Sequence, residues 1–333
     1  MEPRYLTLFV FFLLFVSSGY TQTEEEYLEI GITKRQAEDF RGAIQDYNSA
    51  LKVNPKFSDA YYERGVAKMH LEDFRGAIED FNMTIEINPG SADAYFTRGV
   101  SKIQINDYKG AIWDYTKAIG INPESEDSYF NRGVAREHLK DYVGAIADYN
   151  KSIEINPGSA DAFYARGIVK LRLEDYSRAV IDFTKAIDID PGYAEVYYAS
   201  GNAKYHLDDF RGAIADYTRS IKINPGFGDS YYDRGVSKTH IGDYTGAIAD
   251  FTMAIEINPR SADAYYARGN ARNHVEDYKG ALDDYNITLE INPKSAEAYY
   301  ARSKANLVFG QKDSARQDLR KAAKFDYAQA EKH

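Results

Sequence analysis

The chain has 333 residues, of which 28% are charged and 44% hydrophobic, which is the composition of a soluble folded protein. Its net charge of −10 and pI near 5.2 give an acidic surface that repels phosphate backbones, so nucleic acid is not expected as a partner. The absence of cysteine excludes disulfides, thiolate metal sites and a cysteine nucleophile.

The first residues differ from the rest of the chain. Arg4 precedes an apolar run over residues 5–16, and the small residues Ser17 and Gly19 follow. This order is typical of a secretory signal peptide, which we predict over residues 1–19, with a linker at 20–23. The apolar run, as a helix, reaches about 18 Å, whereas a bilayer core is about 30 Å thick. We therefore expect a secreted or periplasmic protein with no integral membrane domain once the signal is cleaved. An uncleaved membrane anchor is the alternative.

Prolines set a period along the remaining chain. They recur every 34 residues, at Pro55, Pro89, Pro123, Pro157, Pro191, Pro225, Pro259 and Pro293. A fixed period of this length is the signature of a stacked array of helical hairpins. The period divides the chain into nine units, followed by a tail at 330–333; the units are 24–57, 58–91, 92–125, 126–159, 160–193, 194–227, 228–261, 262–295 and 296–329.

Each unit contains the pattern of two helices. In unit 262–295, Ser261 is placed to cap a first helix, in which Tyr265 and Gly269 follow at helical spacing. Apolar residues at intervals of three and four then mark a second helix over 278–291. Pro293 ends it, because proline cannot continue a helix. The sequence therefore predicts a helical hairpin in every unit.

The same residue types recur at fixed positions, counted from 1 to 34 within each unit. An aromatic stands at position 4 from Tyr27 to Tyr299, glycine at position 8 in eight units, and alanine at position 20 in all nine. An aromatic at position 24 and proline at position 32 complete the pattern. With these residues the chain resembles the tetratricopeptide repeat (TPR) proteins. The resemblance implies an all-α fold, a right-handed superhelical solenoid of nine antiparallel helix-turn-helix repeats. The last unit departs from the pattern, with Lys312 and Leu319 at aromatic positions, as expected for a degenerate cap facing water.

Charged residues also recur in register. Position 7 is arginine in seven units, position 11 is lysine or arginine in eight, and position 23 is aspartate in all nine. We predict a ladder of ion pairs in which the cations at 7 or 11 meet the aspartate at 23 between packed helices, setting register more than stability. Capture of an anion by the arginines is the alternative.

Position 5 is the strongest candidate for ligand contact. In TPR proteins position 4 packs inside the hairpin, whereas positions 2, 5, 9, 12 and 13 tend to line the concave groove. Position 2 is acidic in every unit. The resemblance thus implies an aromatic groove edged by carboxylates, suited to a basic or apolar ligand partly through cation–π contact. The alternatives are packing for the aromatics and helix-dipole compensation for the acids. The candidate groove residues are Tyr62, Phe96, Phe130, Tyr164, Tyr198, Tyr232, Tyr266 and Tyr300 at position 5, with Asn202 and Asn270 at position 9.

Histidines cluster at one position of the repeat. Five of the six stand at position 13, namely His70, His138, His206, His240 and His274. Helices pack about 8–10 Å apart, so neighbouring histidines would not readily share a metal, and we predict no metal site. A pH-sensitive groove is the functional hypothesis, because histidine titrates near neutral pH. Descent from one ancestral repeat is the alternative.

The sequence carries no recognisable catalytic motif. There is no phosphate-binding glycine loop, HExxH or GxSxG, and the acids follow the repeat rather than forming a unique pair. We therefore expect no catalytic residue, metal or cofactor. The predicted function is a non-enzymatic scaffold that binds an extended protein or peptide segment in the concave groove. A glycan- or cell-wall-binding scaffold and a structural assembly subunit are the alternatives.

Overall fold

The computed structural model describes residues 22–325, and helix is the only regular secondary structure in this range. The prediction of an all-α chain of nine helix pairs is confirmed by the 18 helices of this range. Contacts between the helices divide the chain into two compact units, and the boundary between them in the sequence lies between Pro157 and Gly158.

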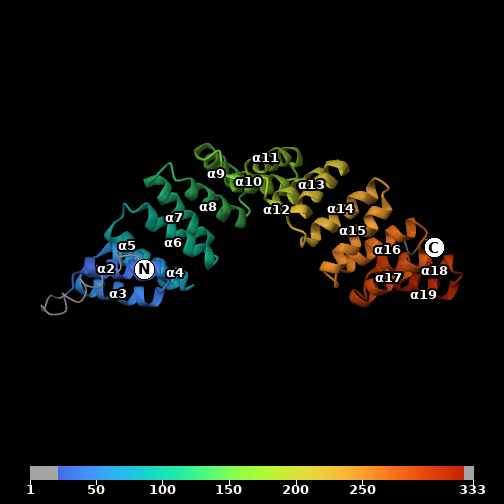
Figure 1. The fold of residues 1–333 in the computed structure, drawn as a ribbon, viewed down its shortest axis with the longest axis horizontal. Coiled ribbons are helices and arrows are strands. Elements are labelled where there is room, and N and C mark those ends of the chain that lie inside the picture. The colour runs from blue at the N-terminus through green and yellow to red at the C-terminus, as the bar shows by residue number, and fades with distance from the viewer. Residues whose placement is uncertain (1–21, 326–333) are drawn as a thin grey trace, which may run out of the picture. The chain divides into compact units, whose positions relative to one another are not determined.

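The first unit contains four helix pairs. In each pair the two helices pack against each other, and the second also packs against the first helix of the next pair (Figure 1). The helices are α2 (Glu24–Gln36), α3 (Phe40–Val53), α4 (Ser58–His70), α5 (Phe74–Ile87), α6 (Ala92–Gln104), α7 (Tyr108–Ile121), α8 (Glu126–His138) and α9 (Tyr142–Ile155).

The second unit contains five helix pairs with the same internal packing. Its helices are α10 (Ala160–Arg172), α11 (Tyr176–Ile189), α12 (Ala194–His206), α13 (Phe210–Ile223), α14 (Gly228–His240), α15 (Tyr244–Ile257), α16 (Ala262–His274), α17 (Tyr278–Ile291), α18 (Ala296–Val308) and α19 (Lys312–Lys324). In both units, therefore, each repeat supplies a first helix from positions 1–13 and a second helix that begins at position 17.

Capping residues explain where most helices begin. The Ser261 hydroxyl accepts a hydrogen bond from the backbone N–H of Ala264, which confirms the predicted cap of α16. Eight of the nine second helices are capped by aspartate at position 16, and α19 has Gln311 there with no side-chain cap. Asp277, for example, accepts from the backbone N–H of Gly280 at 3.0 Å. The residue before this aspartate adopts left-handed backbone, with φ of 58–79° at all nine copies of position 15. This conformation reverses the chain between the two helices.

Glycine at position 8 allows the two helices of a hairpin to approach closely. A Cβ added to Gly269 would lie 2.7 Å from the ring of Tyr285, the position-24 aromatic on the facing helix. Tyr285 is 1% exposed, and Ala281 at position 20 is completely buried beside it. In repeats one to eight, the interior of the hairpin is therefore one large ring packed against a bare stretch of backbone.

The predicted ladder of ion pairs is confirmed. In repeat eight, Arg268 donates to both carboxylate oxygens of Asp284, at 2.8 and 3.1 Å, and Arg272 donates to it at 2.9 Å. Both predicted cations thus meet one aspartate that is 1% exposed. The same Arg–Asp pairs join Arg64 to Asp80, Arg98 to Asp114, Arg132 to Asp148, Arg166 to Asp182, Arg234 to Asp250 and Arg302 to Asp318.

The ladder also connects neighbouring repeats. The remaining Nη1 of Arg268 donates to Thr252, at position 25 of the preceding repeat, at 3.1 Å. The same guanidinium lies over the position-4 ring of Tyr265, 5.4 Å from its centroid. Each such arginine therefore binds its own hairpin and its neighbour, which leaves its donors engaged inside the fold rather than directed at an anion.

The predicted signal at 1–19 and the tail at 330–333 lie outside the described residues, so the signal stays a prediction. Within 22–325, no helix is both long and apolar enough to cross a membrane.

Candidate functional site

The position-5 aromatics pack on the ring at position 24 of their own repeat. In the first unit Tyr62, Phe96 and Phe130 meet their partners with centroids 5.7 Å apart. In the second unit the centroids of four such pairs are 5.7–6.1 Å apart. These seven side chains are half-buried, and Tyr300 is buried. The row therefore covers the core, and two of its members meet a second ring as well: Tyr164 lies 5.2 Å from Tyr193 and Tyr198 lies 4.8 Å from Phe227, between ring centroids. The second-unit pairs are Tyr164–Phe183, Tyr198–Tyr217, Tyr232–Phe251 and Tyr266–Tyr285.

The position-13 histidines are exposed and stack on a neighbouring repeat. His274 lies parallel to Tyr244, the position-17 ring of the preceding repeat, with centroids 4.2 Å apart and planes 5° from parallel. Each histidine thus packs across a junction between repeats, and the pH-sensitive groove stays a prediction. The other four stacks are Phe40–His70, Tyr108–His138, Tyr176–His206 and Phe210–His240.

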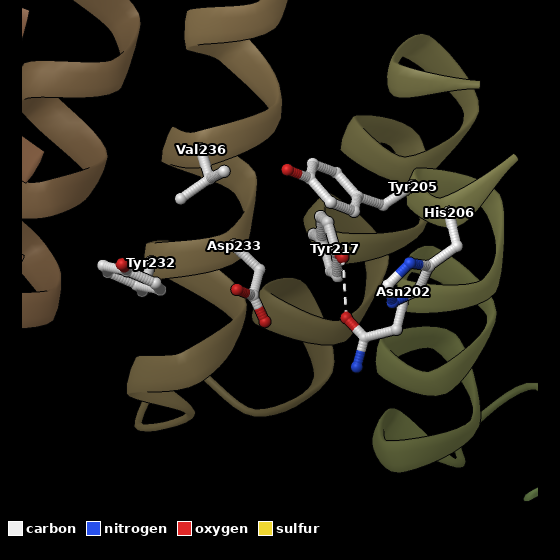
Figure 2. Close-up of a pocket in the computed structure, with 7 residues that line it drawn as sticks. All are labelled: Asn202, Tyr205, His206, Tyr217, Tyr232, Asp233 and Val236. Carbon is white, nitrogen blue, oxygen red and sulfur yellow. Dashed lines mark hydrogen bonds between the residues drawn. The ribbon is translucent and has the colours of Figure 1, made fainter. Parts of the chain in front are cut away.

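Three helices of the second unit line an open pocket of about 340 Å³ (Figure 2). The α12 helix contributes Asn202, Tyr205 and His206, the α13 helix contributes Tyr217, and the α14 helix contributes Tyr232, Asp233 and Val236. Its lining combines aromatic rings, one amide and one carboxylate. This is the mixture of apolar surface and a few polar groups that is typical of ligand pockets.

Hydrogen bonds hold the polar groups of this pocket in place. The Tyr217 hydroxyl donates to Asn202 Oδ1 at 2.7 Å, the bond drawn in Figure 2. The Tyr198 hydroxyl donates to Asp233 Oδ2 at 2.8 Å. Tyr205 OH lies 3.0 Å from His240 Nε2, which connects the pocket to the position-13 histidine of the next repeat. The polar groups are thus fixed before any ligand binds.

Burial controls ionisation in the pocket. Burial raises the pKa of Tyr232 to about 12, with the negative charge of Asp263 as a further cause. Burial also raises the pKa of Asp233 above its ordinary value, while the hydrogen bond from Tyr198 acts in the opposite direction. The tyrosines are therefore neutral hydrogen-bonding groups at neutral pH, and Asp233 is the carboxylate that can supply negative charge.

A second pocket of about 330 Å³ follows directly on α14, α15 and α16. It shares Val236 with the first pocket and adds Thr239, His240, Asn270 and His274 among its lining residues. Asn270 Oδ1 accepts from the Tyr285 hydroxyl at 2.9 Å, as Asn202 does from Tyr217. Positions 9, 12, 13 and 24 of one repeat and positions 6 and 9 of the next line both pockets, so the two are consecutive versions of one arrangement along the first helices of repeats six to eight.

The structure brings several of the predicted residues together. Asn202, His206 and Tyr232 line the first pocket, and His240, Asn270 and His274 line the second. Sequence reasoning did not single out Tyr205 or Asp233. The available signal was a break in the repeat, because position 6 holds Asp233 where repeats five, six, eight and nine have alanine. The first pocket is thus lined both by recurring residues, such as His206 and Tyr232, and by residues that interrupt the repeat, such as Asp233.

The chemistry of the lining is that of binding. Rings, amides, imidazoles and one carboxylate offer stacking, hydrogen bonds and negative charge. Among the described residues, no group of three or more histidine, aspartate or glutamate side chains is placed to hold a metal ion.

Comparison with protein-family models identifies the family to which this helical-hairpin array belongs. Tetratricopeptide repeat models match residues 28–92, 92–125, 126–159 and 164–226, and a TPR repeat model matches 239–272. The chain belongs to the tetratricopeptide repeat family. Members of this family are protein-interaction scaffolds and are generally not enzymes. A comparison with curated proteins found no match.

Solved structures agree with this assignment. YrrB, described as a TPR protein with an unusual peptide-binding site, is 26% identical, covering 56% of this chain and 97% of its own, with a TM-score of 0.52. MamA is 26% identical over 53% of this chain and 96% of its own, with a TM-score of 0.50. The C-terminal part of a TPR repeat-containing protein from Cytophaga hutchinsonii covers 71% of this chain and 98% of its own, with 20% identity and a TM-score of 0.62. The last likeness shows the fold alone.

Proposed function

We propose that this chain is a non-enzymatic scaffold that binds an extended peptide segment along α12, α14 and α16. The observation that carries this proposal is the pair of consecutive pockets that share Val236 and repeat with the period of the fold. A ligand that fills both must itself be extended and must present side chains at intervals, as a peptide does. The description of YrrB as having a peptide-binding site supports this function.

The residues that line the two pockets determine which ligand groups would fit them. The half-buried ring of Tyr232 offers apolar contact, and Asn202 and Asn270 offer fixed amide groups. Aromatic rings beside amides and a carboxylate also suit a glycan, so sugar binding is the second outcome that an experiment must separate.

Selection from a random peptide library, with the purified chain immobilised, tests the proposal. Affinities of the selected peptides are then measured for the wild type and for Thr239→Arg, which places a long cation in the second pocket. Thr239 only donates to a backbone carbonyl of its own helix, so the variant should remain folded. We expect at least tenfold weaker binding.

Thr245→Arg is the matched control, because Thr245 is exposed on α15 and the change in charge is the same. Equal effects of the two substitutions would contradict binding along the first helices. Selection of no peptide, together with retention on an oligosaccharide array that Thr239→Arg abolishes, would favour the glycan.

A further inference from the structure

Asp233 is a half-buried carboxylate that lacks a cationic partner. Among the described residues, the only hydrogen bond to its carboxylate comes from the neutral hydroxyl of Tyr198, at 2.8 Å. No lysine, arginine or histidine among residues 22–325 forms an ion pair with it. Desolvated carboxylates are normally paired, because removing water from a charge without compensation is costly. The pocket therefore contains a negative charge that the fold does not neutralise.

Repeat two carries an acid at the same position, with a cation beside it. In repeat two, position 6 is Glu63, which corresponds to Asp233 in repeat seven. Arg35, at position 12 of the preceding repeat, places its Nε 3.0 Å from Glu63 Oε2. This is a contact between charges rather than an aligned hydrogen bond. The Arg35 charge also acts on Tyr47, the position-24 ring beneath it.

Repeats six and seven keep a tyrosine at position 24 but replace the cation. Repeat six also has Tyr198, Asn202 and His206 at positions 5, 9 and 13, where repeat one has Leu28, Ile32 and Gln36. Position 24 is Tyr217 in place of Tyr47, and position 12 is Tyr205 in place of Arg35. Tyr205 directs its hydroxyl to His240, at 3.0 Å, instead of forming a pair with Asp233. The volume left beside Asp233 is the pocket of Figure 2, about 340 Å³. In this pocket, therefore, the place that Arg35 takes beside Glu63 is open to a cationic group of a partner.

We propose that this pocket binds the guanidinium group of an arginine side chain on the partner. The inference rests on the proposed function, since it names one side chain of the peptide. The carboxylate of Asp233 supplies the charge, and the rings of Tyr205 and Tyr232 supply the flat surfaces on which a planar cation stacks. The net charge of −10 attracts a basic partner during encounter.

The experiment uses the full chain and three short peptides with a central arginine, lysine or citrulline between glycines, blocked at both ends. Citrulline has the shape of arginine without its charge. Binding is followed by NMR titration of the amide signals of α12 and α14. We expect saturable shifts with the arginine peptide, binding at least tenfold weaker for citrulline, and weaker binding for lysine because it is not planar.

Two variants locate the site. Asp233→Asn should weaken binding of the arginine peptide at least tenfold, whereas Asp229→Asn, an exposed acid on the same helix, should change it less than twofold. Tyr205→Arg should fill the pocket from within, as Arg35 does, and abolish binding without lowering the melting temperature.

Three results would overturn the inference. Citrulline binding as tightly as arginine would show that charge is not recognised, and lysine binding as tightly would exclude a guanidinium site. Undiminished binding by Asp233→Asn or Tyr205→Arg would place the arginine elsewhere. If library peptides still bind along α14 and α16 in these cases, the proposed function stands and only the arginine pocket fails. The comparison of arginine with citrulline on the wild type holds even if a variant does not fold.

Discussion

Two aspartates in repeat seven show how surroundings decide what a carboxylate does. Asp250 accepts from Arg234 at 2.6 and 2.9 Å and pairs with Lys238 at 2.8 Å. Asp233, two residues after Tyr231 on the facing helix, receives only a tyrosine hydroxyl. The first is neutralised within the fold, whereas we propose that the second keeps its charge for a ligand. Residue type alone does not separate the two roles.

Removal of a ladder aspartate should destabilise the chain strongly. In Asp284→Ala, Arg268 and Arg272, whose side chains are 12% and 24% exposed in the wild type, lose their common partner. Breaking a buried pair from one side costs about 3–5 kcal/mol. Asp283→Ala is the matched control, since Asp283 is the adjacent, exposed residue of α17. Denaturant unfolding of both variants measures the difference, and equal free energies of unfolding would show that the ladder is energetically neutral.

Asp233→Asn should raise stability at neutral pH. Burial raises the pKa of Asp233 in the folded state, so ionisation opposes folding. The penalty is absent below about pH 3.9, where the unfolded chain also holds the proton. It grows as pH rises from there to the folded-state pKa, and is complete above it. The variant should therefore have a higher melting temperature than the wild type at pH 7, and the difference between the two melting temperatures should decrease at acidic pH. A gap that widens in acid would mean that the carboxylate stabilises the fold.

The sequence could predict residues that repeat, but not residues whose role depends on a neighbour. The histidines and position-5 aromatics were found because nine copies align, and Asn202 and Asn270 because they interrupt position 9. The role that we propose for Asp233 depends on position 12 of another repeat, where Tyr205 stands in place of a cation. Only the structure shows that these two positions meet.

At the scale of the hairpin, the sequence predicted both helices and their capping serine but not the conformation of the turn. Glycine at position 8 could be explained by close approach, and the structure shows the ring of Tyr285 in contact with that backbone. The left-handed residue at position 15 carries no consistent signal, because it is Glu174 in one repeat, Lys140 in another and Gly242 in a third. The packed helices impose this conformation on whichever residue occurs there.

Two glycine-to-alanine substitutions should act in opposite directions. Gly242 has a φ of 79°, so Gly242→Ala should cost about 1 kcal/mol, although other repeats show that a side chain fits. Gly120 lies inside α7 with no atom within 4 Å of an added Cβ. Gly120→Ala should therefore stabilise by about 0.5–1 kcal/mol through helix propensity. Thermal melts provide the measurement. Stabilisation by Gly242→Ala would show that the turn does not hold its left-handed backbone in solution.

At the scale of the whole molecule, contacts inside each unit are local. Helices of one unit touch the next helix along the chain and, more weakly, the next but one. Arg268 is typical, since its partners belong to its own repeat and the one before it. Stability in such an array is approximately a sum of repeat terms and nearest-neighbour terms. The position of a defect along a unit should then matter as much as its chemistry.

The same substitution should therefore have different effects in the middle and at the end of the first unit. A Cβ at Gly99 would lie 2.7 Å from the ring of Tyr115, and one at Gly31 would lie at least as close to Tyr47. Each overpacked hairpin should lose about 1–3 kcal/mol. In Gly31→Ala the first repeat can open alone, so amide hydrogen exchange should accelerate mainly in α2 and α3. In Gly99→Ala the strained repeat has neighbours on both sides, so α4, α5, α8 and α9 should lose protection together with α6 and α7. Uniform loss of protection over the whole unit in both variants would mean that it unfolds as a single cooperative block, against the nearest-neighbour description.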